Sequence, residues 1–103
     1  MKNLSQEEWK EGISTGDNIE ILDVRTPDEY GEGHIPDARN IDIYKGQGFL
    51  DEVNDLDKSK EYYVYCRSGA RSAQACALMQ QQGFENTYNL QGGILEWKGE
   101  ISQ

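Results

Sequence analysis

Apolar residues gather in short runs along the chain, and the polar stretches between them carry the signals that begin and end helices. Residues 19–24 (Ile-Glu-Ile-Leu-Asp-Val) form a nearly continuous apolar run, which is typical of a strand covered on both faces. Residues 61–66 (Glu-Tyr-Tyr-Val-Tyr-Cys) are rich in β-forming side chains and predict a central strand. Residues 86–90 are a further strand candidate, and residues 38–43 are expected to form a short strand.

Helix signals separate the expected strands. Ser5 with Glu8, and Thr26 with Glu29, have the spacing of capping boxes, in which the two side chains satisfy each other's backbone N–H groups. A stretch rich in Ala, Gln, Leu and Met ends at Gly83, a residue suited to close a helix. The expected helices are residues 5–16, 27–33, 49–56 and 71–82, with a short terminal helix that contains Trp97.

The order of these elements predicts the fold class. Strands that alternate with helices at this interval indicate an α/β protein with a parallel central sheet flanked by helices on both faces. The chain has 103 residues with no internal repeat, low-complexity tract or linker-like segment. This length suits one hydrophobic core, so we expect a single domain over residues 1–103.

The charge balance limits the classes of partner. Nineteen acidic residues against ten basic ones give a net charge of −9, which repels phosphate backbones and anionic lipid surfaces. We therefore expect neither nucleic acid nor a membrane as a partner, and we favour a monomer. The sequence has no transmembrane-length apolar run and its first residues lack the apolar core of a signal peptide, so a cytoplasmic protein is expected.

Two cysteines, Cys66 and Cys76, are expected to be free thiols in a reducing compartment. Cys76 lies in the middle of a predicted helix among alanine and leucine residues, which indicates a small core residue. With one histidine, His34, the cysteines cannot complete a four-ligand zinc site. No metal site is expected.

The segment 66–72 (Cys-Arg-Ser-Gly-Ala-Arg-Ser) stands between the predicted central strand and a helix. Backbone N–H groups of a tight loop, with Gly69 at its turn, can surround the Cys66 sulfur. That loop, the helix start and the charges of Arg67 and Arg71 all favour a thiolate and an anionic substrate. The structural alternative is a buried cysteine at a strand end beside two surface arginines.

These motifs, in this order, resemble the rhodanese family. The resemblance rests on Leu-Asp-Val-Arg at residues 22–25, Gly-His-Ile-Pro-Asp-Ala-Arg-Asn at residues 33–40, the Cys66 loop, and Asn-Leu-Gln-Gly-Gly-Ile at residues 89–94. It covers nearly the whole chain. Asp37 departs from the pattern, since members often carry glycine there.

The resemblance implies a sulfurtransferase with Cys66 as the catalytic residue and no cofactor. A sulfane sulfur would pass from thiosulfate, a persulfide or a polysulfide to cyanide, a thiol or a protein acceptor, through a persulfide on Cys66. The substrate-binding residues that it implies are Arg67, Ser68, Gly69, Ala70 and Arg71.

Two other functions remain open at this point. The first is a binding or regulatory module whose thiol turns over little. The second is a cysteine-dependent phosphatase or an arsenate reductase, since such enzymes have similar-looking loops. The loop disfavours the second, because the phosphatase pattern has arginine six positions after the cysteine, where this chain has Ser72, and histidine before it, where this chain has Tyr65.

Four polar residues before the Cys66 loop are expected to be structural. Asp23 and Arg25 end a predicted strand, and Arg25 is expected to pair with Glu29 at the start of the next helix. His34, just before Ile-Pro, is expected to be a hydrogen-bonded turn residue. The alternative is that these side chains orient the acceptor.

Overall fold

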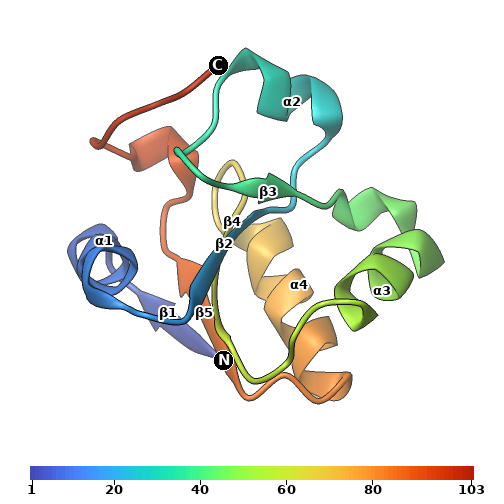
Figure 1. Ribbon diagram of the computed structural model, residues 1–103. Coiled ribbons are helices and arrows are strands. Elements are labelled where there is room, and N and C mark those ends of the chain that lie inside the picture. The colour runs from blue at the N-terminus through green and yellow to red at the C-terminus, as the bar shows by residue number, and fades with distance from the viewer.

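Five parallel strands form the centre of the molecule, in the order β1-β5-β4-β2-β3. The computed structural model describes residues 1–103, and Figure 1 shows the sheet running through the middle of it. The strands are β1 (Lys2–Leu4), β2 (Ile19–Asp23), β3 (Arg39–Asn40), β4 (Glu61–Tyr65) and β5 (Asn86–Leu90). The predicted α/β architecture with a parallel central sheet is confirmed.

Helices cover both faces of this sheet. They are α1 (Gln6–Thr15), α2 (Pro27–Glu32), α3 (Gln47–Asn54) and α4 (Ala70–Gln81), with two 3₁₀ turns, η1 (Ile43–Lys45) and η2 (Ile94–Glu96). Figure 1 shows α1 on one side of the sheet and α3 and α4 on the other. None of the helices combines the length and the apolar character needed to cross a membrane.

Both predicted capping boxes form. The Ser5 hydroxyl accepts from the Glu8 N–H at the start of α1, and Thr26 and Glu29 do the same at the start of α2. These contacts need only residues three positions apart, so the sequence alone is sufficient to place them. The α4 helix begins one residue earlier than expected, at Ala70.

Three elements differ from expectation. The strand β1 was not expected, since it has three residues and no apolar run, and it exists because β5 supplies its partner, with Leu4 opposite Leu90. Only two residues of the expected strand 38–43 pair with β2. The chain then turns into η1, whose Tyr44 N–H donates to the Asp42 carboxylate at 2.9 Å. The short terminal helix is the 3₁₀ turn η2.

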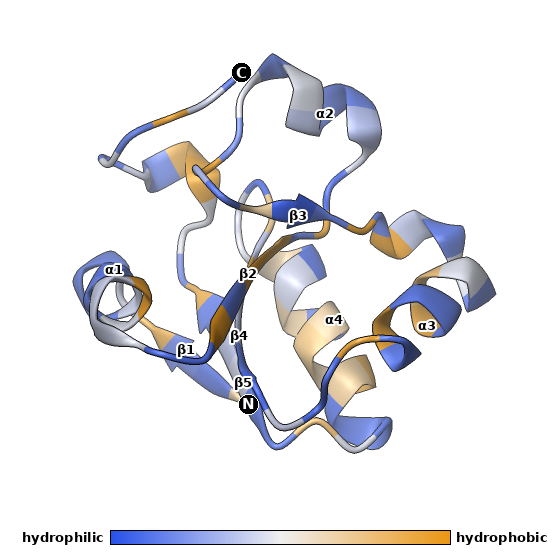
Figure 2. Ribbon diagram, in the orientation of Figure 1, coloured by the Kyte–Doolittle hydropathy of each residue, from blue (hydrophilic) through white to orange (hydrophobic).

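Side chains alternate across the sheet and build a core on each face. On β4, Tyr62 and Val64 face the layer of α3 and α4, whereas Tyr63 and Tyr65 face the layer of α1. Figure 2 shows hydrophobic positions along β2 and on the inner side of α3. Cys76 is a fully buried free thiol in the first core, as expected.

Candidate active site

The Cys66 loop lies at the carboxyl ends of the strands, the edge where α/β proteins bind ligands. Cys66 directly follows β4, and residues 67–69 connect it to α4, visible as the yellow loop above β4 in Figure 1. The segment after β5 supports this loop: the Ile94 N–H donates to the Cys66 carbonyl and the Leu95 N–H to the Arg67 carbonyl, both at 3.0 Å. The base of the loop is therefore fixed from a neighbouring strand end.

Hydrogen-bond donors of the loop and of the first turn of α4 surround the Cys66 sulfur. The Gly69 N–H lies 3.1 Å from Sγ and the Ser72 hydroxyl oxygen 3.4 Å from it. The loop can curl back in this way because Gly69 adopts a φ of +108°, which side-chain-bearing residues rarely reach. The Cys66 residue is 1% exposed.

The two thiols have opposite electrostatic environments. Burial raises the pKa of Cys66, but hydrogen bonds from the Ser72 hydroxyl and from the backbone N–H groups of Ser72, Gly69 and Ser68 outweigh it, so the pKa is lowered overall. Burial raises the pKa of Cys76 to about 12. The thiolate is the nucleophilic form of cysteine, and of the two thiols only Cys66 has surroundings that favour it.

The two arginines of the loop are placed differently. Arg71 donates two hydrogen bonds to the Glu29 carboxylate, at 2.8 and 3.0 Å, and its guanidinium lies 5.4 Å from the centre of the Tyr44 ring. Arg67 is exposed, and its side chain forms no ion pair or hydrogen bond within the protein. Arg67 is thus the unpaired cation of the loop, while Arg71 ties the loop to α2.

The expected pair between Arg25 and Glu29 is wrong. Arg25 binds Asp23 instead, with a closest contact of 2.6 Å, and it also donates to the Gly33 carbonyl at 2.7 Å. The reason is that Asp23 is a buried carboxylate two residues away, whereas Glu29 is occupied by Arg71. The Tyr65 hydroxyl also donates to the Asp23 carboxylate at 2.8 Å, a contact that the sequence did not predict.

His34 is held by hydrogen bonds, as expected, at an isolated bridge just before a turn. Its Nδ1 lies 3.0 Å from the Tyr30 carbonyl oxygen, and its ring stacks on the Tyr30 ring with centres 3.8 Å apart. Its backbone N–H and carbonyl both bond to Ser102. Asp37, in the turn that follows, has a φ of 70° and is the only non-glycine residue with a positive φ.

Sequence reasoning assigned no role to Ser72, which contacts the sulfur, or to Asn89, which contacts Ser72. Ser72, in the first turn of α4, is fully buried, and its hydroxyl also contacts the Asn89 side chain. Asn89 lies on β5 and is 4% exposed. Asn89 stands beside Leu90 in an expected strand, and this position could have indicated the contact, because buried polar groups need hydrogen-bond partners.

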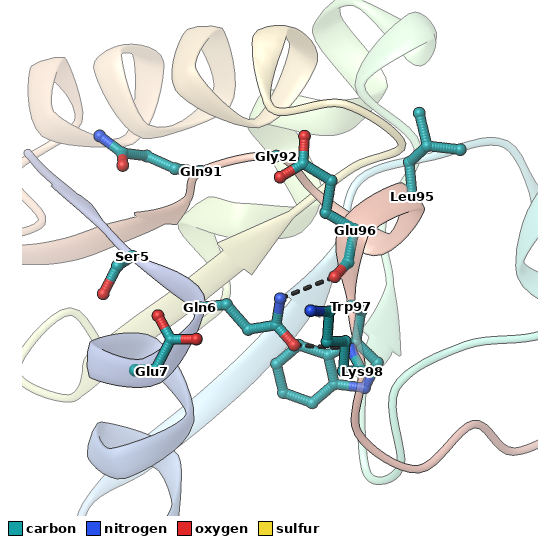
Figure 3. Close-up of a pocket in the computed structure, with 9 residues that line it drawn as sticks. All are labelled: Ser5, Gln6, Glu7, Gln91, Gly92, Leu95, Glu96, Trp97 and Lys98. Atoms are coloured by element: carbon teal, nitrogen blue, oxygen red, sulfur yellow. Dashed lines mark hydrogen bonds between the residues drawn. The ribbon is translucent and has the colours of Figure 1, made fainter.

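A hollow of about 600 Å³ lies next to this region, between the start of α1 and the segment after β5. Figure 3 shows Gln6 linking its walls: the Gln6 side chain donates to the Glu96 carbonyl at 2.7 Å and accepts from the Lys98 N–H at 2.6 Å. Its lining includes no residue of the Cys66 loop. No cluster of three His, Cys, Asp or Glu side chains has the arrangement of a metal site.

Residues 5–100 match the family described as rhodanese-like domain. The chain belongs to the rhodanese-like family. It is 39% identical over 100 residues to the putative sulfurtransferase YtwF of Bacillus subtilis, a match that covers 97% of this chain and 93% of that protein. It is 34% identical over 97 residues to a sulfurtransferase of Allochromatium vinosum, covering 94% of this chain and 88% of that protein.

Solved structures share this fold, including one described as a rhodanese-like domain protein from Staphylococcus aureus, with a TM-score of 0.81 at 30% identity over all of both chains. A crystal structure from Staphylococcus saprophyticus superposes with a TM-score of 0.85 at 32% identity, and the match covers all of both chains. The same unit also occurs in longer proteins, such as the tRNA uridine(34) hydroxylase of Cytophaga hutchinsonii, which is 34% identical over 98 residues, 93% of this chain and 31% of that protein.

Proposed function

We propose that this rhodanese-like protein is a sulfurtransferase that carries a sulfane sulfur as a persulfide on Cys66. The observation that carries the proposal is the sulfur's surroundings: the Gly69 N–H at 3.1 Å and the Ser72 hydroxyl at 3.4 Å favour the thiolate despite burial. The sulfurtransferase names of two relatives that match nearly the whole chain support it.

In the first half-reaction, the Cys66 thiolate attacks the outer sulfur of an anionic donor such as thiosulfate. The sulfur–sulfur bond of thiosulfate breaks, and sulfite leaves with the bonding electron pair. The product is a persulfide whose negative charge lies on its outer sulfur. No general base is required, because the nucleophile is already ionised.

In the second half-reaction, a nucleophilic acceptor takes the outer sulfur. Cyanide attacks it to give thiocyanate, the bond between the two sulfurs breaks, and the electron pair returns to Cys66 as the thiolate. A thiol or an acceptor protein would react at the same sulfur. Neither half-reaction needs a cofactor or an external oxidant.

The other loop residues have separate roles in this scheme. The exposed Arg67 attracts the anionic donor, while the backbone N–H groups of Ser68 and Gly69 stabilise negative charge on sulfur. Ala70 begins α4, whose N-terminal end is electropositive. Arg71 holds the loop against α2 through Glu29 and adds positive charge near the sulfur.

A phosphatase has less support from the same geometry. Such an enzyme needs an arginine whose paired N–H donors face the transferred phosphoryl group. Both terminal nitrogens of the Arg71 guanidinium donate to Glu29. Arg67 directly follows Cys66 in the sequence, and in that position its side chain cannot complete a binding loop around the sulfur.

The proposal is tested by intact-mass measurement after incubation with thiosulfate. The desalted wild-type protein should gain the mass of one sulfur atom, and cyanide should remove it. The variant Cys66→Ser should gain nothing. Cys76→Ser is the matched control, since Cys76 is fully buried with a raised pKa, and it should gain sulfur like the wild type.

A donor series decides between the alternatives. If a polysulfide adds mass but thiosulfate does not, the proposed sulfur transfer is supported with polysulfide as the donor. Absence of a Cys66-dependent gain with either donor would overturn the proposal in favour of a non-catalytic binding module. Equal gains in the wild type and Cys66→Ser would remove Cys66 from the reaction.

A further inference from the structure

The Ser72 hydroxyl faces more acceptors than it can serve. Its oxygen lies 3.4 Å from the Cys66 sulfur, 3.2 Å from the Gly69 carbonyl oxygen and 2.5 Å from Oδ1 of Asn89. A hydroxyl has one proton and donates to one acceptor at a time. The Cys66 sulfur, the Gly69 carbonyl and the Asn89 amide oxygen therefore compete for the same proton, and the Asn89 oxygen lies nearest to it.

The orientation of the Asn89 amide is fixed by its other contacts. Its Nδ2 donates to Oδ1 of Asn3 at 2.9 Å and to the Gly69 carbonyl at 3.3 Å. A backbone carbonyl only accepts hydrogen bonds, so the amide nitrogen must face Gly69. The amide oxygen then has to face Ser72, and β1, which places Asn3 beside Asn89, helps to hold it there.

We propose that Asn89 is a positioning residue that holds the Ser72 hydroxyl proton while the Cys66 sulfur is uncharged and yields it when the thiolate forms. The switch is a rotation about the Cβ–Oγ bond of Ser72, and no covalent bond changes. The relevance of this switch to sulfur transfer rests on the proposed function.

The thiolate and the persulfide of the proposed cycle differ in where the negative charge lies, and the Ser72 proton responds to that difference. The thiolate carries its charge on Sγ, 3.4 Å from the Ser72 oxygen, and charged acceptors form the stronger hydrogen bonds. In the persulfide, Sγ is neutral and the charge lies on the outer sulfur, so the Ser72 proton returns to Asn89. When the thiolate forms, the bond from Ser72 to sulfur replaces the bond from Ser72 to Asn89, so the thiolate is stabilised only by the difference in strength between them. Asn89 thereby reduces the effect of Ser72 on the Cys66 thiolate.

Other groups near the sulfur are independent of Asn89. Arg71, which is paired with Glu29 of α2, and Cys76 of α4 are the titratable groups whose charge interacts with Cys66. None of these three is a hydrogen-bond partner of Asn89. Replacing Asn89 with an uncharged residue therefore leaves their contacts in place.

The test follows the ultraviolet absorbance of the thiolate during a pH titration, with Cys66→Ser as the blank. Asn89→Ala should lower the midpoint of the Cys66 titration, because the only other acceptor left near the Ser72 hydroxyl is then the neutral Gly69 carbonyl, which competes weakly with a thiolate. Ser72→Ala should raise it and reduce the thiolate fraction below the midpoint by about tenfold. The double variant should match Ser72→Ala alone, as expected when one residue acts through the other.

Two controls keep the test sharp. Asn3→Ala removes one partner of the Asn89 nitrogen but leaves Oδ1 on Ser72, and it should leave the midpoint unchanged. If Asn89→Ala does not fold, Asn89→Leu removes the same acceptor at nearly the same volume. A shift that is equal with and without Ser72, an upward shift, or no shift in the Asn89 variant overturns the inference.

The titration contains no sulfur donor, so its outcome is separate from the proposed function. A protein that takes up no sulfur but shows the expected midpoints contradicts the proposed function and supports the positioning role. A protein that takes up sulfur but whose midpoint ignores Asn89 contradicts the positioning role alone.

Discussion

At the scale of single residues, one carboxylate connects two parts of the molecule. Glu29 accepts from the Thr26 N–H and hydroxyl in the α2 capping box, and from both terminal nitrogens of Arg71. Arg71 is therefore bound to the start of α2. The sequence suggests that the charge of Arg71 attracts the substrate, and the structure shows that the same side chain also ties the Cys66 loop to α2.

This pair predicts acid sensitivity. Chiefly through its hydrogen bonds from Arg71, the pKa of Glu29 is lowered from 4.5 to about 2. A lowered acid pKa stabilises the folded state above the unfolded value and loses that contribution as the pH falls through the folded one. The unfolding free energy should therefore decline between about pH 4.5 and 2, and Glu29→Gln should remove this part of the decline.

Denaturant unfolding of the wild type and Glu29→Gln across this range measures the effect. Glu52→Gln is the matched control, because the Glu52 pair with Lys45 has both side chains about half exposed and contributes little. Parallel pH profiles for the wild type and Glu29→Gln would contradict the assignment.

At the scale of elements, the segment after β5 packs its backbone directly on the Cys66 loop. Gly93 has a φ of 60°, and a Cβ placed there would lie 2.3 Å from the Arg67 carbonyl oxygen and 2.7 Å from that of Cys66. Both atoms are backbone and cannot swing aside. The close approach is what allows η2 to donate its N–H groups to the loop.

Gly93→Ala should therefore displace the loop as well as destabilise the fold. We expect a loss of roughly 1–3 kcal/mol in unfolding free energy, from overpacking and strained backbone together, and slower sulfur uptake at Cys66. Thermal unfolding and the mass measurement check both parts. Gly31→Ala in α2 is the control, since no atom outside its own helix lies within 4 Å of the added Cβ, and this variant should lose no stability.

The elements that could be predicted are those whose signals are local. Both capping boxes join residues three positions apart, and the apolar runs of β2 and β4 indicate buried strands on their own. The strand β1 carries no such signal, because its structure depends on pairing with β5 at the other end of the chain.

The same limit applies to the site. The Cys66 loop was recognisable because strand, cysteine, glycine and helix start are contiguous in sequence. The partner of Glu29 was predicted wrongly, since spacing favoured Arg25, four positions away, over Arg71, which lies 42 positions away. The Ser72–Asn89 contact was missed for a similar reason, as it joins residues 17 positions apart on a helix and a strand.

At the scale of the whole molecule, the sheet separates two cores, and one aromatic side chain holds much of the smaller one. Trp9 of α1 is fully buried. Its ring meets Tyr63, Tyr65 and Trp97 edge to face, with centres 5.6 to 6.0 Å apart. Its Nε1 donates to the Tyr88 carbonyl. The residue therefore joins α1, the sheet and the segment after β5.

Trp9→Ala should cost about 3–5 kcal/mol of unfolding free energy, a large part of the total for a domain that is stable by about 5–15 kcal/mol. Denaturant unfolding followed by circular dichroism measures it without relying on tryptophan fluorescence. Leu95→Ala is the comparison, since Leu95 is 64% exposed and its loss should change stability by less than about 0.5 kcal/mol. Similar losses for the two variants would refute the central role of Trp9.

The edges of the sheet have a consequence for the behaviour of the protein at high concentration. The outer strands, β1 and β3, have three and two residues, whereas the inner strands have five each. An exposed strand edge invites pairing with another chain, and very short edge strands reduce that risk. A second copy would find only a two- or three-residue ladder on either side. The sheet is thus protected against open-ended, amyloid-like growth by the brevity of its borders.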